Sequence, residues 1–410
     1  MSETFNSSDF TAEHIRQDVL QGLRFDINGA SLPPLTWTPG LIFPSGGISP
    51  YGLVFFNTPT GGPVQLAASY PVVIDQTAGP VSVVAPPGVG ADALAESGGL
   101  TFSLTGGFGF IHTEANFDPF TGAPPAGDLI AVSGSGSTIA AGEGADTVVA
   151  LSGNNNIATG TGNNQVFLQG GDNLVGSEGN DTIVAGASND TVDASGNARA
   201  FGGSGVMTFL NTFGSSTVAG GAGSLITNGG LGSLTAFGGL AGNNSLVAGM
   251  SGGVLVGGGN GDQLVATGFA ADELVAGTGN ETLNGGGARG NDTFFGGTGS
   301  AFVVMGNGPD LYIGNSGNDT VVAGIGNDTM FASAATNVFA FVNGRAGGFD
   351  LIGNFRVGAD VISLQGYGPG EDAAAFQSAI VANGNTVLRL PDSTTITLVG
   401  LTNLSPSSLV

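Results

Sequence analysis

The chain contains no cysteine and no lysine, and it has only two histidines among its 410 residues. Without cysteine it forms no disulfide framework, thiol nucleophile or thiolate metal site. Without lysine it has neither a Schiff-base amine nor the lysine of a phosphate-binding loop. The histidines, His14 and His112, do not form the paired HExxH motif of a zinc site. These absences exclude several large classes of enzyme chemistry.

Positive charge is equally scarce, because seven arginines face 31 acidic residues and the formal net charge is −24. Nucleic acids and anionic membranes are bound by basic patches, so neither is an expected partner. No run of 18 apolar residues occurs, so we expect no membrane span. The first ten residues lack a basic and an apolar region, which argues against a classical signal peptide and leaves the cytosol or export by another signal.

Glycine is abundant, with 77 residues, and hydrophobic residues make up 41% of the chain. That hydrophobic content argues against disorder, and the lack of a strict three-residue glycine period argues against collagen. The composition predicts an all-β chain of short strands and tight turns in three segments. Residues 1–127 are predicted to form a small β-rich domain with one helix over 11–23 and strands over 53–57, 71–75, 81–85 and 100–104.

Residues 128–345 repeat with a period of nine. The sequence GEGADTVVA at 142–150 recurs as GSEGNDTIV at 176–184 and as GNSGNDTVV at 314–322. An acid or amide is followed two residues later by an apolar residue, predicted to point inward: Val148, Ile157, Val166, Leu174, Ile183, Val192, Leu264, Leu274, Leu283, Phe294, Tyr312, Val321, Met330 and Phe339. A fixed short period with one inward apolar position predicts a parallel β-solenoid of stacked two-strand coils, each about 18 residues long.

In such a coil, residues 18 apart lie one above the other. The pattern therefore stacks Asp172 on Asp190, Asp310 on Asp328, and Asp146 on Asn164. Two carboxylates about 5 Å apart repel by roughly 3 kcal/mol at an effective dielectric constant near 20. Calcium relieves this repulsion best, because it accepts irregular cages of carboxylate and carbonyl oxygens. The predicted metal ligands are Asp146, Asp172, Asp181, Asp190, Asp292, Asp310, Asp319 and Asp328.

Two other interpretations of these residues remain open. Each aspartate or asparagine of an isolated G-x-D can cap its own turn through the backbone. The asparagines Asn155, Asn164 and Asn337, which are weaker metal ligands, can form amide ladders between coils.

The repeats at 142–193 and 305–331 resemble the calcium-binding nonapeptide of RTX proteins. Residues 350–364 resemble the stretch that follows the repeats in the serralysin proteases, and 383–410 are similar to C-terminal segments of type I secretion substrates. The resemblance implies a calcium-stabilised parallel β-roll, a C-terminal β cap with an export signal over 346–410, and an extracellular destination. It also implies the type I secretion machinery as a partner, with folding delayed until calcium is met outside the cell.

The sequence departs from the family pattern in two places. Residues 200–261 carry no charge, so we expect solenoid without calcium there, serving lateral or end-wise packing or merely a spacer. The protease part of the serralysins is absent. These features favour a structural, non-enzymatic protein that assembles with itself into a surface layer, filament or matrix. The alternatives are an extracellular hydrolase or lyase acting on polysaccharide, and an adhesin.

Overall fold

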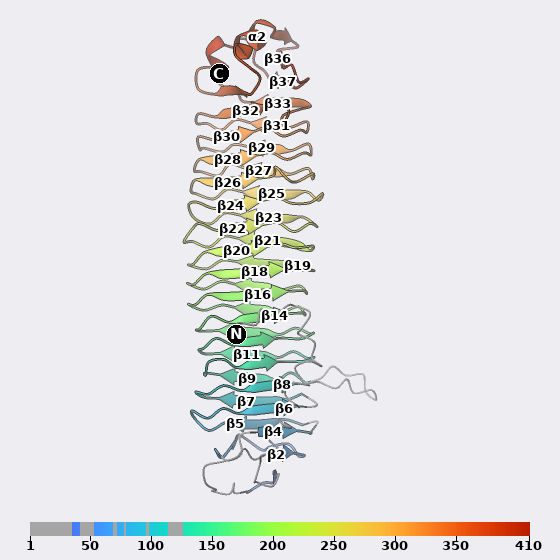
Figure 1. Cartoon of the computed structure of the whole chain (residues 1–410), viewed down its shortest axis with the longest axis vertical. Coiled ribbons are helices and arrows are strands. Elements are labelled where there is room, and N and C mark those ends of the chain that lie inside the picture. Colours follow the sequence, from blue (N-terminus) through green and yellow to red (C-terminus); the bar gives the residue numbers. More distant parts are fainter. Residues whose placement is uncertain (1–34, 42–52, 69–71, 78, 96–97, 114–125) are drawn as a thin grey trace. The chain divides into compact units, whose positions relative to one another are not determined.

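The computed structural model describes residues 35–41, 53–68, 72–77, 79–95, 98–113 and 126–410. The helix predicted over 11–23 lies outside the described residues. The chain divides into two compact units, Met1–Phe209 and Leu210–Val410, which we call unit 1 and unit 2. Within each unit the strands form two parallel sheets, here sheet A and sheet B, and the chain alternates between them (Figure 1).

Sheet A of unit 1 contains nine strands that lie wholly within the unit. They are β1 (Leu35–Thr36), β2 (Leu53–Phe56), β4 (Val72–Asp75), β6 (Asp92–Ala95), β8 (Phe110–Thr113), β10 (Thr138–Ala140), β12 (Asn156–Ala158), β14 (Leu174–Ser177) and β16 (Asp190–Ala194). Sheet B of unit 1 contains β3 (Val64–Gln65), β5 (Val81–Val84), β7 (Leu100–Leu104), β9 (Leu129–Val132), β11 (Thr147–Ala150), β13 (Gln165–Leu168), β15 (Thr182–Val184) and β17 (Arg199–Phe201). Strand β18 (Met207–Asn211) crosses the division between the units in sequence.

Unit 2 repeats this arrangement. Its sheet A contains β20 (Leu225–Asn228), β22 (Ser245–Val247), β24 (Gln263–Val265), β26 (Glu281–Asn284), β28 (Ala301–Val304), β30 (Thr320–Val322), β32 (Val338–Val342) and β34 (Val361–Gln365). Its sheet B contains β19 (Ser215–Ala219), β21 (Ser233–Phe237), β23 (Gly253–Val256), β25 (Asp272–Val275), β27 (Thr293–Phe295), β29 (Leu311–Ile313), β31 (Thr329–Phe331) and β33 (Phe349–Gly353). The parallel β-solenoid predicted from the nine-residue period is confirmed, including over residues 210–261 of the uncharged stretch.

The core of each coil is a thin line of inward side chains. Thirteen of the fourteen predicted inward residues are fully buried, and successive ones pair in register, as Val148 does with Val166. The prediction for Leu174 is wrong, because Val175 is the buried residue of that strand and pairs with Val192. Leu174 and Val175 are both apolar, so the hydrophobic pattern alone does not set the register there.

The described strands before residue 127 continue the same ladders. Strand β7 pairs in parallel with β9, and β8 pairs in parallel with β10. The four strands predicted in that segment form as β2, β4, β5 and β7. The composition changes after residue 127, where a domain boundary is predicted, but the strand ladders of unit 1 continue across that position. The three-domain division stays a prediction.

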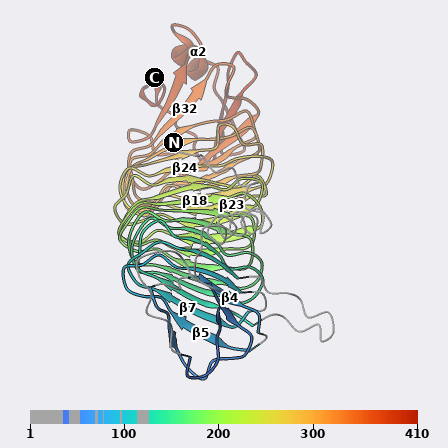
Figure 2. The same cartoon turned by 60° about the horizontal axis from the view of Figure 1, so that its bottom comes forward.

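A β cap closes unit 2 at its C-terminal end. Strand β37 (Thr395–Leu398) pairs in parallel with β33, and β36 (Asn385–Arg389) and β35 (Ile380–Ala382) follow it antiparallel. The short helix α2 (Glu371–Gln377) and the 3₁₀ turn η2 (Pro406–Ser408) belong to this cap (Figure 2). The described residues contain no helix long and apolar enough to cross a membrane.

Glycine in the G-x-D motif is required by the distance between coils. A Cβ added to Gly308 would lie 1.7 Å from the carbonyl oxygen of Gly290 in the neighbouring coil, and one on Gly326 would lie 1.9 Å from that of Gly308. No side chain fits in that space, so the turns stack closely only with glycine two residues before the aspartate. The stacked turns place the aspartates of successive coils beside one another.

Candidate metal centre

A column of five buried aspartates lies at the turns that lead into sheet B of unit 2. The backbone N–H of each of the first four donates a hydrogen bond to Oδ1 of the next member, at donor–acceptor distances of 2.8, 2.9, 3.1 and 2.9 Å along the column. We call this set the unit-2 Asp column; its members are Asp272, Asp292, Asp310, Asp328 and Asp350. The predicted stacking of Asp310 on Asp328 is confirmed.

The second carboxylate oxygen differs along the column. Oδ2 of Asp310 and of Asp328 accepts a turn N–H, from Gly306 at 2.6 Å and from Gly324 at 3.0 Å. In Asp292 and Asp350, by contrast, the buried Oδ2 has no hydrogen-bond partner in the described part of the chain. A buried carboxylate oxygen without a donor carries a full desolvation cost, so these atoms require a counter-charge or a proton.

Burial dominates the electrostatics of the column. It raises the pKa of Asp272 and of Asp310 to about 7, that of Asp328 to about 6 and that of Asp350 to about 8. Burial also raises the pKa of Asp292. Neighbouring carboxylates raise the pKa of Asp272, Asp310 and Asp350 further, whereas the backbone N–H donors lower it. At neutral pH the column therefore holds several closely spaced carboxyl groups that ionise with difficulty.

Unit 1 has a shorter column at the corresponding turns of its sheet B. Oδ1 of Asp146 accepts the N–H of Asp128 at 2.7 Å, and Oδ1 of Asn164 accepts the N–H of Asp146 at 2.9 Å. The predicted stacking of Asp146 on Asn164 is confirmed. Oδ2 of both Asp128 and Asp146 is buried without a hydrogen bond among the residues described. Burial raises the pKa of Asp146 to about 7.

Amides replace acids along much of sheet A. Nδ2 of Asn155 donates to Oδ1 of Asn173 at 3.1 Å, and Nδ2 of Asn173 donates to Oδ1 of Asp190 at 2.9 Å. In unit 2, Nδ2 of Asn337 donates to Oδ1 of Asp360 at 2.9 Å. The amide ladders considered from the sequence are therefore present, and they bring no second charge beside each acid.

Two predicted ligands accept a side-chain hydroxyl on one carboxylate oxygen and a backbone N–H on the other. Oδ2 of Asp181 accepts the hydroxyls of Thr159 and Ser177, each at 2.6 Å, while its Oδ1 accepts the N–H of Asn164. Oδ2 of Asp319 accepts the buried phenol of Tyr312 at 2.6 Å, and its Oδ1 accepts the N–H of Ala301. Protein groups alone satisfy these carboxylates.

The structure buries seven of the eight predicted ligands in these columns, and the exception is Asp172. Asp172 is exposed, and its neighbour Asn173 holds the column position, so the predicted stacking of Asp172 on Asp190 is wrong. The ligand prediction omits further buried acids of the same columns, although each is followed two residues later by an apolar residue, as the pattern requires. They are Asp128, Asp262, Asp272, Glu281, Asp350 and Asp360.

The donor set fits a hard divalent cation. Open, buried carboxylate oxygens belong to Asp128, Asp146, Asp272, Asp292 and Asp350, and Glu281 adds Oε1. Among the residues that the structure describes, no three acids or histidines converge as a ready metal cluster. A calcium ion would therefore use one or two carboxylates at each turn together with main-chain carbonyl oxygens, as its tolerance of mixed oxygen ligands allows.

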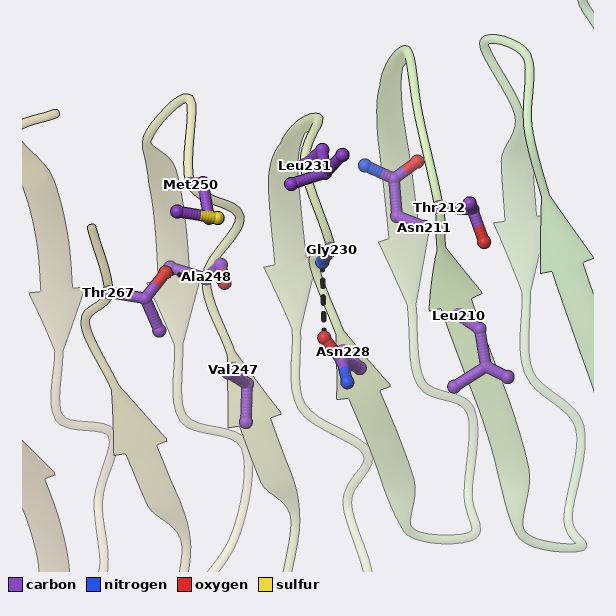
Figure 3. Close-up of a pocket in the computed structure, with 10 residues that line it drawn as sticks. All are labelled: Leu210, Asn211, Thr212, Asn228, Gly230, Leu231, Val247, Ala248, Met250 and Thr267. Atoms are coloured by element: carbon purple, nitrogen blue, oxygen red, sulfur yellow. Dashed lines mark hydrogen bonds between the residues drawn. The ribbon is translucent and has the colours of Figure 1, made fainter. Parts of the chain in front are cut away.

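A groove of about 480 Å³ on unit 2 is a separate candidate site. Consecutive coils line it with Leu210, Asn211, Thr212, Asn228, Gly230, Leu231, Val247, Ala248, Met250 and Thr267 (Figure 3). Oδ1 of Asn228 accepts the N–H of Gly230 at 3.1 Å. None of the ten residues is an acid, a histidine or an arginine, so the groove itself offers no general acid or base.

Comparison with known families identifies the repeats. The family of the RTX calcium-binding nonapeptide repeat (four copies) matches residues 133–167, 168–198, 257–289, 268–303 and 306–339. Together these ranges cover about a third of the chain and contain all eight predicted ligands, but not Asp128 or Asp350. They leave out most of the uncharged stretch. No curated protein matches the chain.

Proposed function

Because this chain is an RTX β-roll protein with calcium-binding repeats, we propose that it is an extracellular structural protein whose fold depends on calcium and which assembles with copies of itself. RTX repeats indicate a secreted calcium-binding protein, and calcium is the cofactor of these repeats. Export by type I secretion machinery and a place at the cell surface are parts of the proposal.

The observation that carries the proposal is the unit-2 Asp column. Five buried carboxyl groups follow one another from coil to coil, and four of them accept the backbone N–H of the neighbouring turn. Bound calcium supplies positive charge beside these carboxylates. We propose that Asp272, Asp292 and Asp350 hold it through their open oxygens and that turn carbonyls complete the ligand set.

The same contacts favour a structural role over catalysis. Four of the five column acids use one carboxylate oxygen to accept the backbone N–H of an adjacent coil, so these oxygens hold the coils together and are not presented to a substrate. A chain that remains unfolded at low calcium passes a secretion channel extended and then folds outside. The hydrolase and adhesin alternatives have no specific observation in their favour within the described ranges.

Electron microscopy and sedimentation velocity of the full chain, in calcium and in EGTA at matched ionic strength, test this function. We expect ordered assemblies in calcium and only unfolded monomers in EGTA. A folded, monodisperse monomer at millimolar concentration in calcium would contradict the assembly part of the proposal.

A further inference from the structure

The outer surface of sheet B in unit 2 carries an unbroken apolar column. One outward residue from each of six consecutive strands, β21 to β31, pairs in register with the next. Phe237 and Phe331 are 43% and 40% exposed, and the other four are half-buried. The column consists of Phe237, Val256, Val275, Phe295, Ile313 and Phe331.

The second outward position on these strands adds a single charge. Parallel to the apolar column run Thr235, Val254, Glu273, Thr293, Leu311 and Thr329. We call these two columns the unit-2 face. Its twelve side chains include one exposed carboxylate, Glu273, although the chain carries 31 acidic residues. A broad apolar face with one charge is unusual for a surface left in water.

Unit 1 has a similar surface with the opposite charge. On β11 to β17 the outward apolar residues are Val149, Phe167, Val184 and Phe201, again in register. The second outward column is Thr147, Gln165, Thr182 and Arg199. We call these two columns the unit-1 face. Its only charged side chain is Arg199, which is exposed.

Neither charge is compensated by the described part of its own chain. Among the residues that the structure describes, neither Arg199 nor Glu273 makes an ion pair. Covering either face with an apolar surface would bury an uncompensated charge, and covering a unit-2 face with another unit-2 face would bury two carboxylates. A unit-1 face on a unit-2 face pairs the charges instead.

We propose that the unit-1 face of one molecule packs on the unit-2 face of a second copy, with Arg199 opposite Glu273. In reversed strand order, β17 then faces β25 and β11 faces β31, so four strands of each copy meet. This inference rests on the self-assembly proposed above and names the surface that assembly uses. The occupant is a second copy because a face of complementary charge is present on this chain, whose net charge of −24 repels copies elsewhere.

The size of the contact makes it weak by itself. Four strands spaced by about 4.8 Å and three residues wide cover about 200 Å² on each copy. Stable protein pairs bury about 800 Å² per partner. The contact therefore holds only as one of many in an extended assembly, where linked contacts reinforce one another. Assembly is expected to show a threshold concentration rather than a stable dimer.

Charge reversal tests the pairing. The full chain in calcium is compared as wild type, Arg199→Glu, Glu273→Arg and the double reversal, with light scattering to measure the threshold concentration for assembly. Each single reversal places like charges together and raises the threshold at least about tenfold, and the double reversal restores it. Arg345→Glu, the same charge change at an exposed turn, leaves the threshold unchanged. Calcium-induced folding, followed by circular dichroism, is the same in all variants because these side chains point outward.

The outcomes separate this inference from the function on which it rests. A wild-type chain that never assembles in calcium contradicts the proposed self-assembly. A wild type that assembles together with single reversals that assemble equally well overturns only the facing of Arg199 and Glu273. A Glu273→Gln variant that assembles more readily than wild type indicates that unit-2 faces pair with each other, which also overturns it, because the proposed pairing would leave Arg199 without its partner.

Discussion

At the scale of single residues, the buried acids are of two kinds. Asp181 and Asp319 have donors on both oxygens, from the backbone of a neighbouring coil and from hydroxyl groups. Asp292 has a backbone donor on Oδ1 only, and its Oδ2 is buried without a partner in the described residues. In the first kind, protein donors satisfy both carboxylate oxygens. In the second kind, one oxygen is satisfied only by a cation or a proton.

Asp292→Asn and Asp319→Asn test that difference. Asparagine at 292 keeps the Oδ1 acceptor and removes the buried charge. We therefore expect the calcium concentration at the folding midpoint to rise about tenfold. Asparagine at 319 disturbs the Tyr312 hydrogen bond, so we expect a loss of about 1–3 kcal/mol in the free energy of unfolding in saturating calcium. Calcium titrations followed by denaturant unfolding measure both. Equal calcium dependence in the two variants would refute the distinction.

Glycine in the G-x-D turn makes a steric prediction. Gly308→Ala places a Cβ 1.7 Å from the carbonyl oxygen of Gly290, so the coils must separate locally. We expect a loss of about 3 kcal/mol or more in the free energy of unfolding, with weaker calcium binding at Asp310. Gly287→Ala, where nothing lies within 4 Å of the added Cβ, is the matched control and changes little. Thermal unfolding in calcium compares the melting temperatures of the two variants. Similar melting temperatures would show that the turns accommodate the side chain.

The sequence predicts most residue positions because one acid and one apolar residue recur at a fixed offset. The prediction fails where two candidates are adjacent. Asp172 and Asn173 precede Leu174 and Val175, and choosing the acid moves the register by one residue. The repeat pattern does not predict the hydroxyl donors either. The phenol of Tyr312, in the core of sheet B, reaches Asp319, at the turn before a strand of sheet A, only because the coil brings the two together.

At the scale of strands and coils, register is set by the inward residue. Val175 is fully buried and Leu174 is not, so their truncation costs should be unequal. We expect Val175→Ala to lower the free energy of unfolding by about 2 kcal/mol and Leu174→Ala by well under 1 kcal/mol. Urea unfolding in calcium measures both changes. The reverse order would restore the register predicted from the sequence.

The column of acids makes the stability of each coil depend on pH. Burial raises the pKa of Asp272 and of Asp310 to about 7 and that of Asp350 to about 8, all well above their unfolded values. Between the pKa values of the unfolded chain and these raised values, the folded state binds more protons than the unfolded state. The free energy of unfolding therefore falls as pH rises through this range. In EGTA we expect the folded fraction, followed by circular dichroism, to decrease from pH 5.5 to pH 8.

Calcium reverses this trend, because it takes the place of the protons. We expect calcium affinity to rise over the same pH range, and calorimetry in buffers of different ionisation enthalpy to detect proton release on binding. A folded fraction that does not change between pH 5.5 and pH 8 in EGTA would mean that ionisation of the buried carboxyl groups does not destabilise the folded chain.

At the scale of the whole molecule, solenoid, calcium sites and assembly surface follow from the same repeat. The residue at the turn supplies the acid, the inward residue fills the core, and the outward residues on either side of it form the faces. The sequence pattern reveals the first two directly. The faces are not evident from it, because the outward columns appear only when strands 17 to 20 residues apart are placed side by side.

The central claim is that buried columns of carboxyl groups are tolerated in the folded chain because calcium neutralises them. Circular dichroism of the full chain at pH 7.5, first in EGTA and then through a calcium titration with magnesium as control, tests it most directly. We expect little β structure in EGTA or in magnesium and a cooperative gain of β structure with calcium. The same β spectrum and the same melting temperature in EGTA as in calcium would contradict it.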